Sequence, residues 1–72
     1  MSKFVDDLSV SEAITIRECM TVLDKHGEGI VLVVDEKRYL IATITDGDIR
    51  RAIINNIDIE LPVRILLDHR ES

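Results

Sequence analysis

The chain has 72 residues, of which 46% are apolar but only 3% aromatic, and its formal net charge at pH 7 is −5. This acidic balance argues against binding to a nucleic-acid backbone, and no apolar run approaches the roughly 18 residues of a membrane span. A chain of this length forms one small domain that buries only about 60% of its unfolded surface, so we expect it to pair with a second copy or another domain.

The amino terminus and the cysteine content indicate a cytoplasmic protein. Residues 1–7 lack the basic segment followed by an apolar run that marks an exported chain. The single cysteine, Cys19, cannot form an internal disulfide, and its place beside Met20 predicts a small buried apolar residue.

The amino-terminal part predicts a short extended segment followed by an amphipathic helix. The extended segment is expected around Phe4–Leu8. Between Thr15 and His26, apolar residues recur at the spacing of one helix face, at positions 16, 19, 20 and 23. Gly27 then follows, as is typical of a helix end with a cation near its carboxyl terminus.

Two strands are predicted next. Ile30–Val34 is an uninterrupted aliphatic run rich in β-branched residues, which favours a strand covered on both faces. Asp35–Arg38 is short and fully charged, so it suits a hairpin loop into a second, antiparallel strand at Tyr39–Ile44.

A second helix and an apolar tail complete the pattern. Apolar residues at positions 49, 52 and 53 form a helical stripe, and Leu61–Leu67 adds apolar residues with no strand of this chain to complete. The order strand, helix, strand, strand, helix indicates an α+β fold with two helices on one face of a small sheet. Because the other face would be uncovered, we expect Ile30–Val34 to be an association surface.

The junction between the second strand and the second helix, Thr45–Arg51, concentrates polar residues. Thr45 and Asp48 fit a capping box, in which the threonine hydroxyl accepts from a helix amide and the carboxylate accepts from the threonine amide. Two carboxylates in a first helical turn also complement the helix dipole. Spacing alone therefore favours a helix cap around a tight Asp46-Gly47 turn.

The same residues also suit a ligand. A carboxylate at Asp48 can accept hydrogen bonds from a vicinal diol such as a ribose, while Thr45 and the first helix amides face a phosphate. Arg50 or Arg51 would then neutralise the phosphate, although the arginine pair fits a solvated helix face equally well.

Catalytic and metal-binding patterns are weak in this sequence. Asp46-Gly47-Asp48 matches a D-x-D metal motif, but no third acidic or histidine ligand follows at helix spacing. We expect His26 and His69 to face solvent, and we find no glycine-rich phosphate loop and no paired nucleophile and base. The sequence predicts no catalytic residue, no metal and no required cofactor, so this chain is not expected to be an enzyme.

Three segments, taken in their order along the chain, resemble a CBS domain, the module named after cystathionine β-synthase. The segments are Ile14–Glu18, Val33–Glu36 and Ala42–Arg51, and the resemblance covers roughly residues 4–67. It implies a β-α-β-β-α unit that pairs with a second module through its sheet. It also implies a cleft that takes AMP, ADP, ATP or S-adenosylmethionine as a regulatory ligand.

The resemblance assigns site residues through the family motif G-x-x-T-x-x-D. Thr45 and Asp48 fall on its threonine and aspartate, which implies a phosphate-facing hydroxyl and a ribose-binding carboxylate. Ala42 replaces the glycine, and its methyl group narrows the approach of a ligand to the backbone. Further ligand candidates are Ile14, Thr15, Ala42, Arg50 and Arg51.

The sequence of Thr45–Arg51 is especially similar to that in the CBS pairs of sugar-phosphate nucleotidyltransferases and of sugar-phosphate isomerases. The nucleotidyltransferase type is favoured, with residues 1–60 as one module and residues 61–72 as a linker strand that opens a second, truncated module. The partner is then a second copy or a second CBS module. The alternative is a purely structural dimerisation module without ligand.

Overall fold

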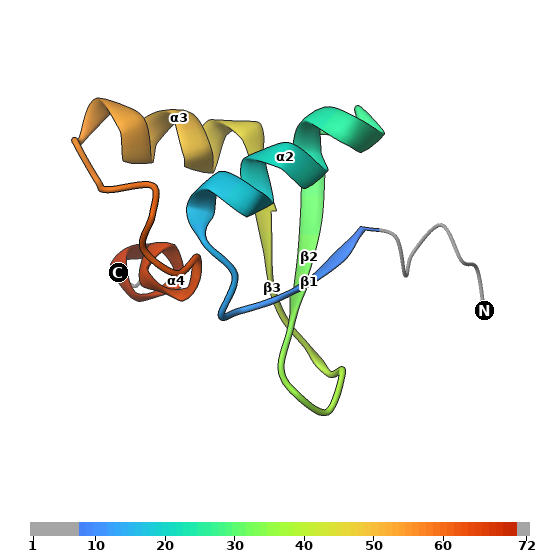
Figure 1. The fold of residues 1–72 in the computed structure, drawn as a ribbon. Coiled ribbons are helices and arrows are strands. Elements are labelled where there is room, and N and C mark those ends of the chain that lie inside the picture. The colour runs from blue at the N-terminus through green and yellow to red at the C-terminus, as the bar shows by residue number, and fades with distance from the viewer. Residues whose placement is uncertain (1–7, 71–72) are drawn as a thin grey trace.

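The computed structural model describes residues 8–70, and side chains are described as far as residue 67. Figure 1 shows the elements in chain order, and the predicted α+β unit is confirmed. They are β1 (Ser9–Ser11), α2 (Ile16–His26), β2 (Ile30–Val34), β3 (Leu40–Thr45), α3 (Asp46–Ile54) and α4 (Arg64–Arg70). Of the predicted extended segment Phe4–Leu8, residues 4–7 lie outside the described part, and the first strand within the described residues begins at Ser9.

The three strands form one mixed sheet in the order β1-β2-β3. β1 runs parallel to β2, while β3 is antiparallel to β2, as the charged hairpin predicts. The register pairs Val31 with Ile44 and Val33 with Ala42, and it then shifts so that Val34 pairs with Leu40. The shift is an irregularity in the edge strand just before Ala42.

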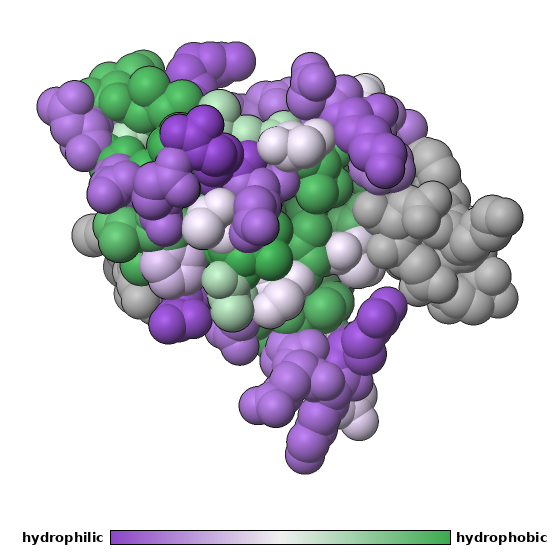
Figure 2. Space-filling view, in the orientation of Figure 1, coloured by the Kyte–Doolittle hydropathy of each residue, from purple (hydrophilic) through white to green (hydrophobic). Residues whose placement is uncertain are grey.

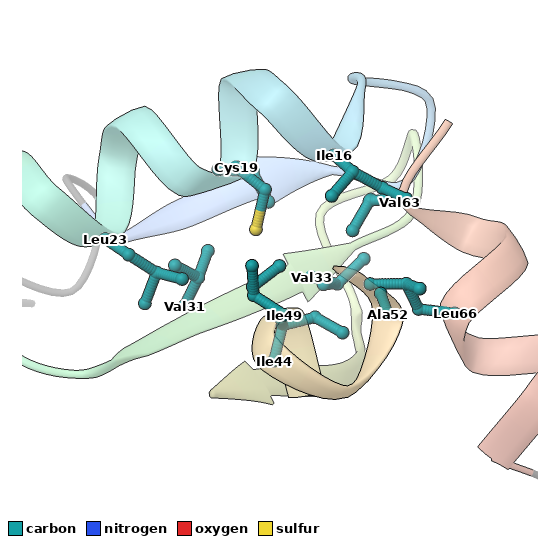
Figure 3. Close-up of a cluster of buried hydrophobic side chains, with 11 residues drawn as sticks. Ile16, Cys19, Leu23, Val31, Val33, Ile44, Ile49, Ala52, Val63 and Leu66 are labelled. Carbon is teal, nitrogen blue, oxygen red and sulfur yellow. The ribbon is translucent and has the colours of Figure 1, made fainter. Parts of the chain in front are cut away.

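One face of the sheet is covered by α2 and α3, which lie on the same side of it in Figure 1. Val31, Val33 and Ile44 have no exposed surface and pack in the cluster drawn in Figure 3 with Ile16 and Ile49. Side chains alternate between the faces of a strand, so the remaining residues of β2 point the other way and are only half-buried. The prediction that β2 is covered on both faces is thus correct for one face within this chain.

The helix α2 has the ends and the buried face that its sequence predicts. Thr15 caps the start in a full capping box with Glu18, and Gly27, with φ 65°, ends the helix with its N–H on the carbonyl of Leu23. Cys19 has no exposed surface, and burial raises the pKa of its thiol to about 11. The thiol is therefore neutral at pH 7 and acts as an apolar core group.

The tail forms a helix and not the predicted linker strand. Val63 and Leu66, three residues apart, are 0% and 5% exposed and join the same core as α2 and α3. The Val63 N–H donates to the Ile14 carbonyl at 2.7 Å, and Pro62 forms an isolated bridge with Thr15. Residues 61–67 therefore pack against the module that was predicted to end at residue 60, because the start of α2 offers them an apolar partner.

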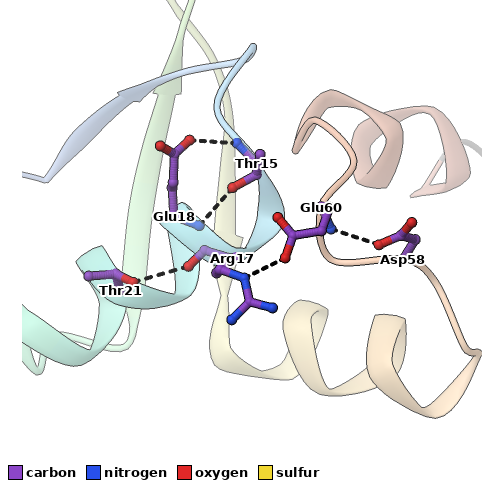
Figure 4. A network of polar contacts seen from close by, with 6 residues as sticks. All are labelled: Thr15, Arg17, Glu18, Thr21, Asp58 and Glu60. Carbon is purple, nitrogen blue, oxygen red and sulfur yellow. Dashed lines mark hydrogen bonds and ion pairs between the residues drawn. The ribbon is translucent and has the colours of Figure 1, made fainter.

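The segment before this tail also contacts the start of α2. Figure 4 shows Arg17 paired with Glu60, whose own N–H donates to the Asp58 carboxylate. The backbone N–H groups of Ile16 and Arg17 donate to the carbonyls of Leu61 and Ile59, both at 2.9 Å. Two of the four amides that a helix start normally leaves open are thus satisfied by this segment.

Candidate functional site

The strand β3 runs directly into α3, and Thr45 is both the last strand residue and the helix cap. Its extended backbone, with φ −114° and ψ 169°, leads straight into a first turn that contains Asp46 and Gly47. The predicted tight Asp-Gly turn is therefore wrong, because Asp46 and Gly47 form the first turn of α3 instead. The predicted capping box is confirmed, with the Asp48 N–H donating to the Thr45 hydroxyl oxygen at 3.3 Å.

The Asp48 carboxylate lies at the centre of this junction. Its Oδ2 accepts from the Thr45 N–H at 2.9 Å and from the Thr45 hydroxyl at 3.1 Å, while its Oδ1 accepts from Arg51 Nη2 at 2.7 Å. The Asp48 side chain is only 11% exposed, whereas that of Arg51 is 68% exposed. The cap thus holds a mostly buried carboxylate in one orientation beside a solvent-facing guanidinium.

Gly47 lies between the hydroxyl of Thr45 and the guanidinium of Arg51. A Cβ at this position would lie 3.5 Å from Arg51 Nη1 and 3.6 Å from Thr45 Oγ1. Within residues 8–70, no hydrogen-bond acceptor is found for the Gly47 N–H. An amide, a hydroxyl and a guanidinium therefore surround one position at a helix start, where backbone amides favour an anion.

The loop before β2 supports this helix start from the other side. The Asp46 N–H donates to the Gly29 carbonyl at 3.3 Å, and Gly29 adopts φ +76°. A Cβ on Gly29 would lie 3.4 Å from Asp46 Oδ2, so the loop approaches the carboxylate closely. The sequence analysis named neither Gly29 nor Gly47 as a site residue. The sequence feature that could have pointed to Gly47 is a glycine at the second position of a helix.

The structure separates the two arginines that the sequence analysis treated as a pair. Arg51 contacts Asp48, whereas Arg50 lines a groove of about 390 Å³ between α2 and α3, together with Met20 and Asp24. The groove continues to Ile53 and Ile54, which are 49% and 68% exposed. Figure 2 shows apolar residues gathered at this outer end of α3, while the hairpin tip is hydrophilic.

The remaining ligand candidates have other partners. Thr15 and Glu18 use their polar groups in the capping box of α2, and the Ile14 carbonyl accepts from Val63. Ala42 is half-buried, pairs with Val33 and packs against the core. The structure thus brings Thr45, Asp48 and Arg51 together and places Ile14 and Thr15 at the other helix start.

No metal site and no membrane helix occurs in the part of the chain that the structure describes. Among the described side chains, no three histidine, cysteine, aspartate or glutamate residues come together as metal ligands would. His26 is half-buried at the end of α2, which differs from the predicted solvent-facing position, and the side chain of His69 lies outside the described ones. No helix of residues 8–70 has both the length and the apolar character needed to cross a membrane.

The three-stranded mixed sheet, the two helices on one face and the polar junction at Thr45 define a small α+β module. The chain belongs to the CBS domain family, whose family model matches residues 1–55. This confirms the resemblance that the motif order indicates.

Two solved structures have the same fold. A CBS domain protein from Pyrobaculum aerophilum complexed with AMP is 28% identical, has a TM-score of 0.77, and is matched over 82% of this chain and 47% of its own. An uncharacterized conserved protein from Pyrococcus horikoshii is 22% identical with a TM-score of 0.76 over 92% of this chain and 49% of its own. The chain thus spans about half the length of each.

Two relatives also match in sequence over part of their length. An uncharacterized protein of Chlamydia muridarum is 46% identical over 43 residues, which are 60% of this chain and 13% of the relative. The chloride channel protein CLC-f of Arabidopsis thaliana is 37% identical over 49 residues, 68% of this chain and 6% of the relative. The module therefore occurs within much longer proteins.

Proposed function

We propose that this CBS module binds an adenine nucleotide at the start of α3 and thereby regulates the protein to which it belongs. The observation that carries the proposal is the orientation of Asp48 by its own capping box, next to the open amide of Gly47. The AMP complex of the Pyrobaculum aerophilum relative, 28% identical to this chain, supports the ligand class.

Each group at the junction has a chemical role in this proposal. Asp48 accepts hydrogen bonds from the two hydroxyls of a ribose, because a carboxylate has acceptor sites for both. Thr45 and the Gly47 amide face the phosphate at the positive end of the helix. Arg51 supplies the positive charge that the two carboxylates of the first turn require.

The proposal includes pairing with a second module or a second copy. The face of β2 that α2 and α3 do not cover is apolar and half-buried. Tyr39, just before the edge strand β3, is 69% exposed, and Leu40 and Ile41 at the start of β3 are 60% and 44% exposed. Covering these residues would remove exposed apolar side chains from water. Sedimentation of a stable, folded monomer at micromolar concentration would contradict this part of the proposal.

A longer parent protein is also part of the proposal. The sequence of Thr45–Arg51 favours a sugar-phosphate nucleotidyltransferase as the parent protein, with residues 61–72 leading into a second module. A sugar-phosphate isomerase is the alternative parent protein. Sequencing the gene on both sides of the segment that encodes residues 1–72 tests this directly. If neither a nucleotidyltransferase domain nor an isomerase domain is encoded there, both assignments are wrong.

Calorimetry on the full chain with AMP, ADP, ATP and S-adenosylmethionine tests the ligand site. Asp48→Ala is compared with Glu18→Ala, which removes the matching carboxylate from the capping box of α2. We expect both changes to lower the free energy of unfolding by about 0.5–2 kcal/mol, as cap losses do, and only Asp48→Ala to weaken AMP binding, by about tenfold or more. Absence of binding by the folded wild-type chain, or undiminished binding by Asp48→Ala, would overturn the site.

A second candidate function is a structural pairing module without ligand. It is favoured by the fact that both oxygens of Asp48 already accept hydrogen bonds within the chain. Under this alternative Thr45 and Asp48 only cap α3, and none of the four compounds raises the unfolding temperature of the chain. A rise with any one of them excludes this alternative.

A further inference from the structure

Arg51 occupies part of the position that a ribose would take on Asp48. Oδ2 of Asp48 already accepts two hydrogen bonds from Thr45, which uses both of its lone pairs. The diol of a ribose must therefore turn toward Oδ1, where Arg51 Nη2 donates at 2.7 Å. Two hydroxyls and the guanidinium cannot share the two lone pairs of this one oxygen.

Arg51 is able to leave this position. Its side chain is 68% exposed, so little packing holds the guanidinium against the mostly buried carboxylate of Asp48. Its Nη1 already lies 3.5 Å from the position that a Cβ on Gly47 would take, and Gly47 is the residue whose amide has no acceptor within residues 8–70. A small rotation of the side chain carries the guanidinium from the carboxylate to an anion bound at that amide.

We infer that, in the free chain, Arg51 occupies the position on Asp48 that the diol of a bound ribose takes. A bound nucleotide displaces the Arg51 guanidinium, which then binds the phosphate of that nucleotide. The inference rests on the proposed function and adds a rule of ligand selection. A nucleoside monophosphate offers the displaced guanidinium a phosphate as a new partner, whereas a nucleoside offers none. The site therefore selects nucleotides over nucleosides through the contact between Arg51 and Asp48 that exists in the ligand-free chain.

The neighbouring Arg50 provides a matched control. The change Arg50→Ala removes the same charge from the same helix as Arg51→Ala, but Arg50 lines the groove toward α2 with Met20 and Asp24. Arg50→Ala and Arg51→Ala thus change the net charge equally, and only the second removes the contact to Asp48.

The test measures the affinities of AMP and adenosine for the full wild-type chain, Arg51→Ala and Arg50→Ala by calorimetry. We expect Arg51→Ala to strengthen adenosine binding and to weaken AMP binding, each by about threefold, so that the ratio of the two affinities falls by about tenfold. Arg50→Ala leaves the ratio unchanged. Arg51→Lys, which keeps the charge but not the forked geometry, gives an intermediate ratio.

The outcomes separate this inference from the proposed function. If AMP binds the wild-type chain but Arg51→Ala shifts both affinities in the same direction or leaves both unchanged, Arg51 is not the displaced occupant and the nucleotide site still stands. If neither compound binds either folded chain, with folding checked by circular dichroism, the proposed function fails and the inference fails with it. Adenosine binding by Arg51→Ala alone supports the displacement.

Discussion

The two helices that cover the sheet begin with the same motif and differ in what surrounds it. Thr15 and Glu18 cap α2, and Thr45 and Asp48 cap α3, with both reciprocal hydrogen bonds present in each box. At the second helical position, Arg17 donates its N–H to the Ile59 carbonyl, whereas the Gly47 N–H has no acceptor within residues 8–70. Both helix starts are therefore partly covered by other segments, since the Asp46 N–H donates to the Gly29 carbonyl, and they differ at the Gly47 amide.

The difference shows that a capping box does not by itself indicate a ligand site. Both boxes satisfy the same local requirement of a helix start. What distinguishes them is a segment far away in sequence, residues 59–63, whose carbonyls reach the amides of α2. The open start of α3 is the one where a phosphate can approach backbone amides.

The largest effect that tests this comparison is expected at the first helical position. Ile16 has no exposed surface, so Ile16→Ala should lower the free energy of unfolding by about 2–5 kcal/mol, through lost burial and a cavity. The matched change Asp46→Ala removes an exposed side chain and should cost less than about 1 kcal/mol. Urea denaturation measures both, and similar losses would contradict the view that only α2 begins inside the core.

The two cap threonines should separate stability from binding. Thr15→Ala and Thr45→Ala should each lower the free energy of unfolding by about 0.5–2 kcal/mol, because each removes the acceptor for a helix amide. Only Thr45→Ala should also weaken AMP binding in calorimetry. An equal loss of affinity in both variants would show that binding merely follows stability.

Gly47→Ala should move stability and binding in opposite directions. Its φ is not positive and an added Cβ would make only ordinary contacts, so alanine should raise the free energy of unfolding by about 0.4–1 kcal/mol. The same methyl group stands between the open amide and an approaching phosphate, so AMP affinity should fall. As a control, Gly27→Ala, where φ is +65°, should lower stability by about 1 kcal/mol without changing the affinity. Unchanged AMP binding by Gly47→Ala would remove this amide from the site.

The smallest effect is expected from the ion pair that joins α2 to the covering segment. The side chains of Arg17 and Glu60 are 62% and 57% exposed, so a double-mutant cycle with alanine should give a coupling energy of about 0.2–1 kcal/mol. The coupling should shrink in high salt. A much larger coupling would mean that this pair, and not the buried Val63, holds the segment in place.

The sequence predicted well what depends on neighbouring residues. The limits of α2, the hairpin and the capping box at Thr45 follow from periodicity, turn residues and caps, which act within a few positions. It failed for Leu61–Leu67, because apolar residues with no visible partner fit several structures and the partner is the distant start of α2. It also failed to distinguish Arg50 from Arg51, since which one faces the groove depends on where α2 packs.

By itself, the sequence determined the class of fold and the residues at the candidate site, because strand alternation, helix periodicity and the Thr-x-x-Asp cap are local properties of the chain. Only the tertiary structure decided that Arg51 contacts Asp48 and that, among residues 8–70, no acceptor reaches the Gly47 amide while the matching amide of Arg17 is bonded. The physical reason is that an amide is available to a ligand only when no other part of the folded chain has reached it first.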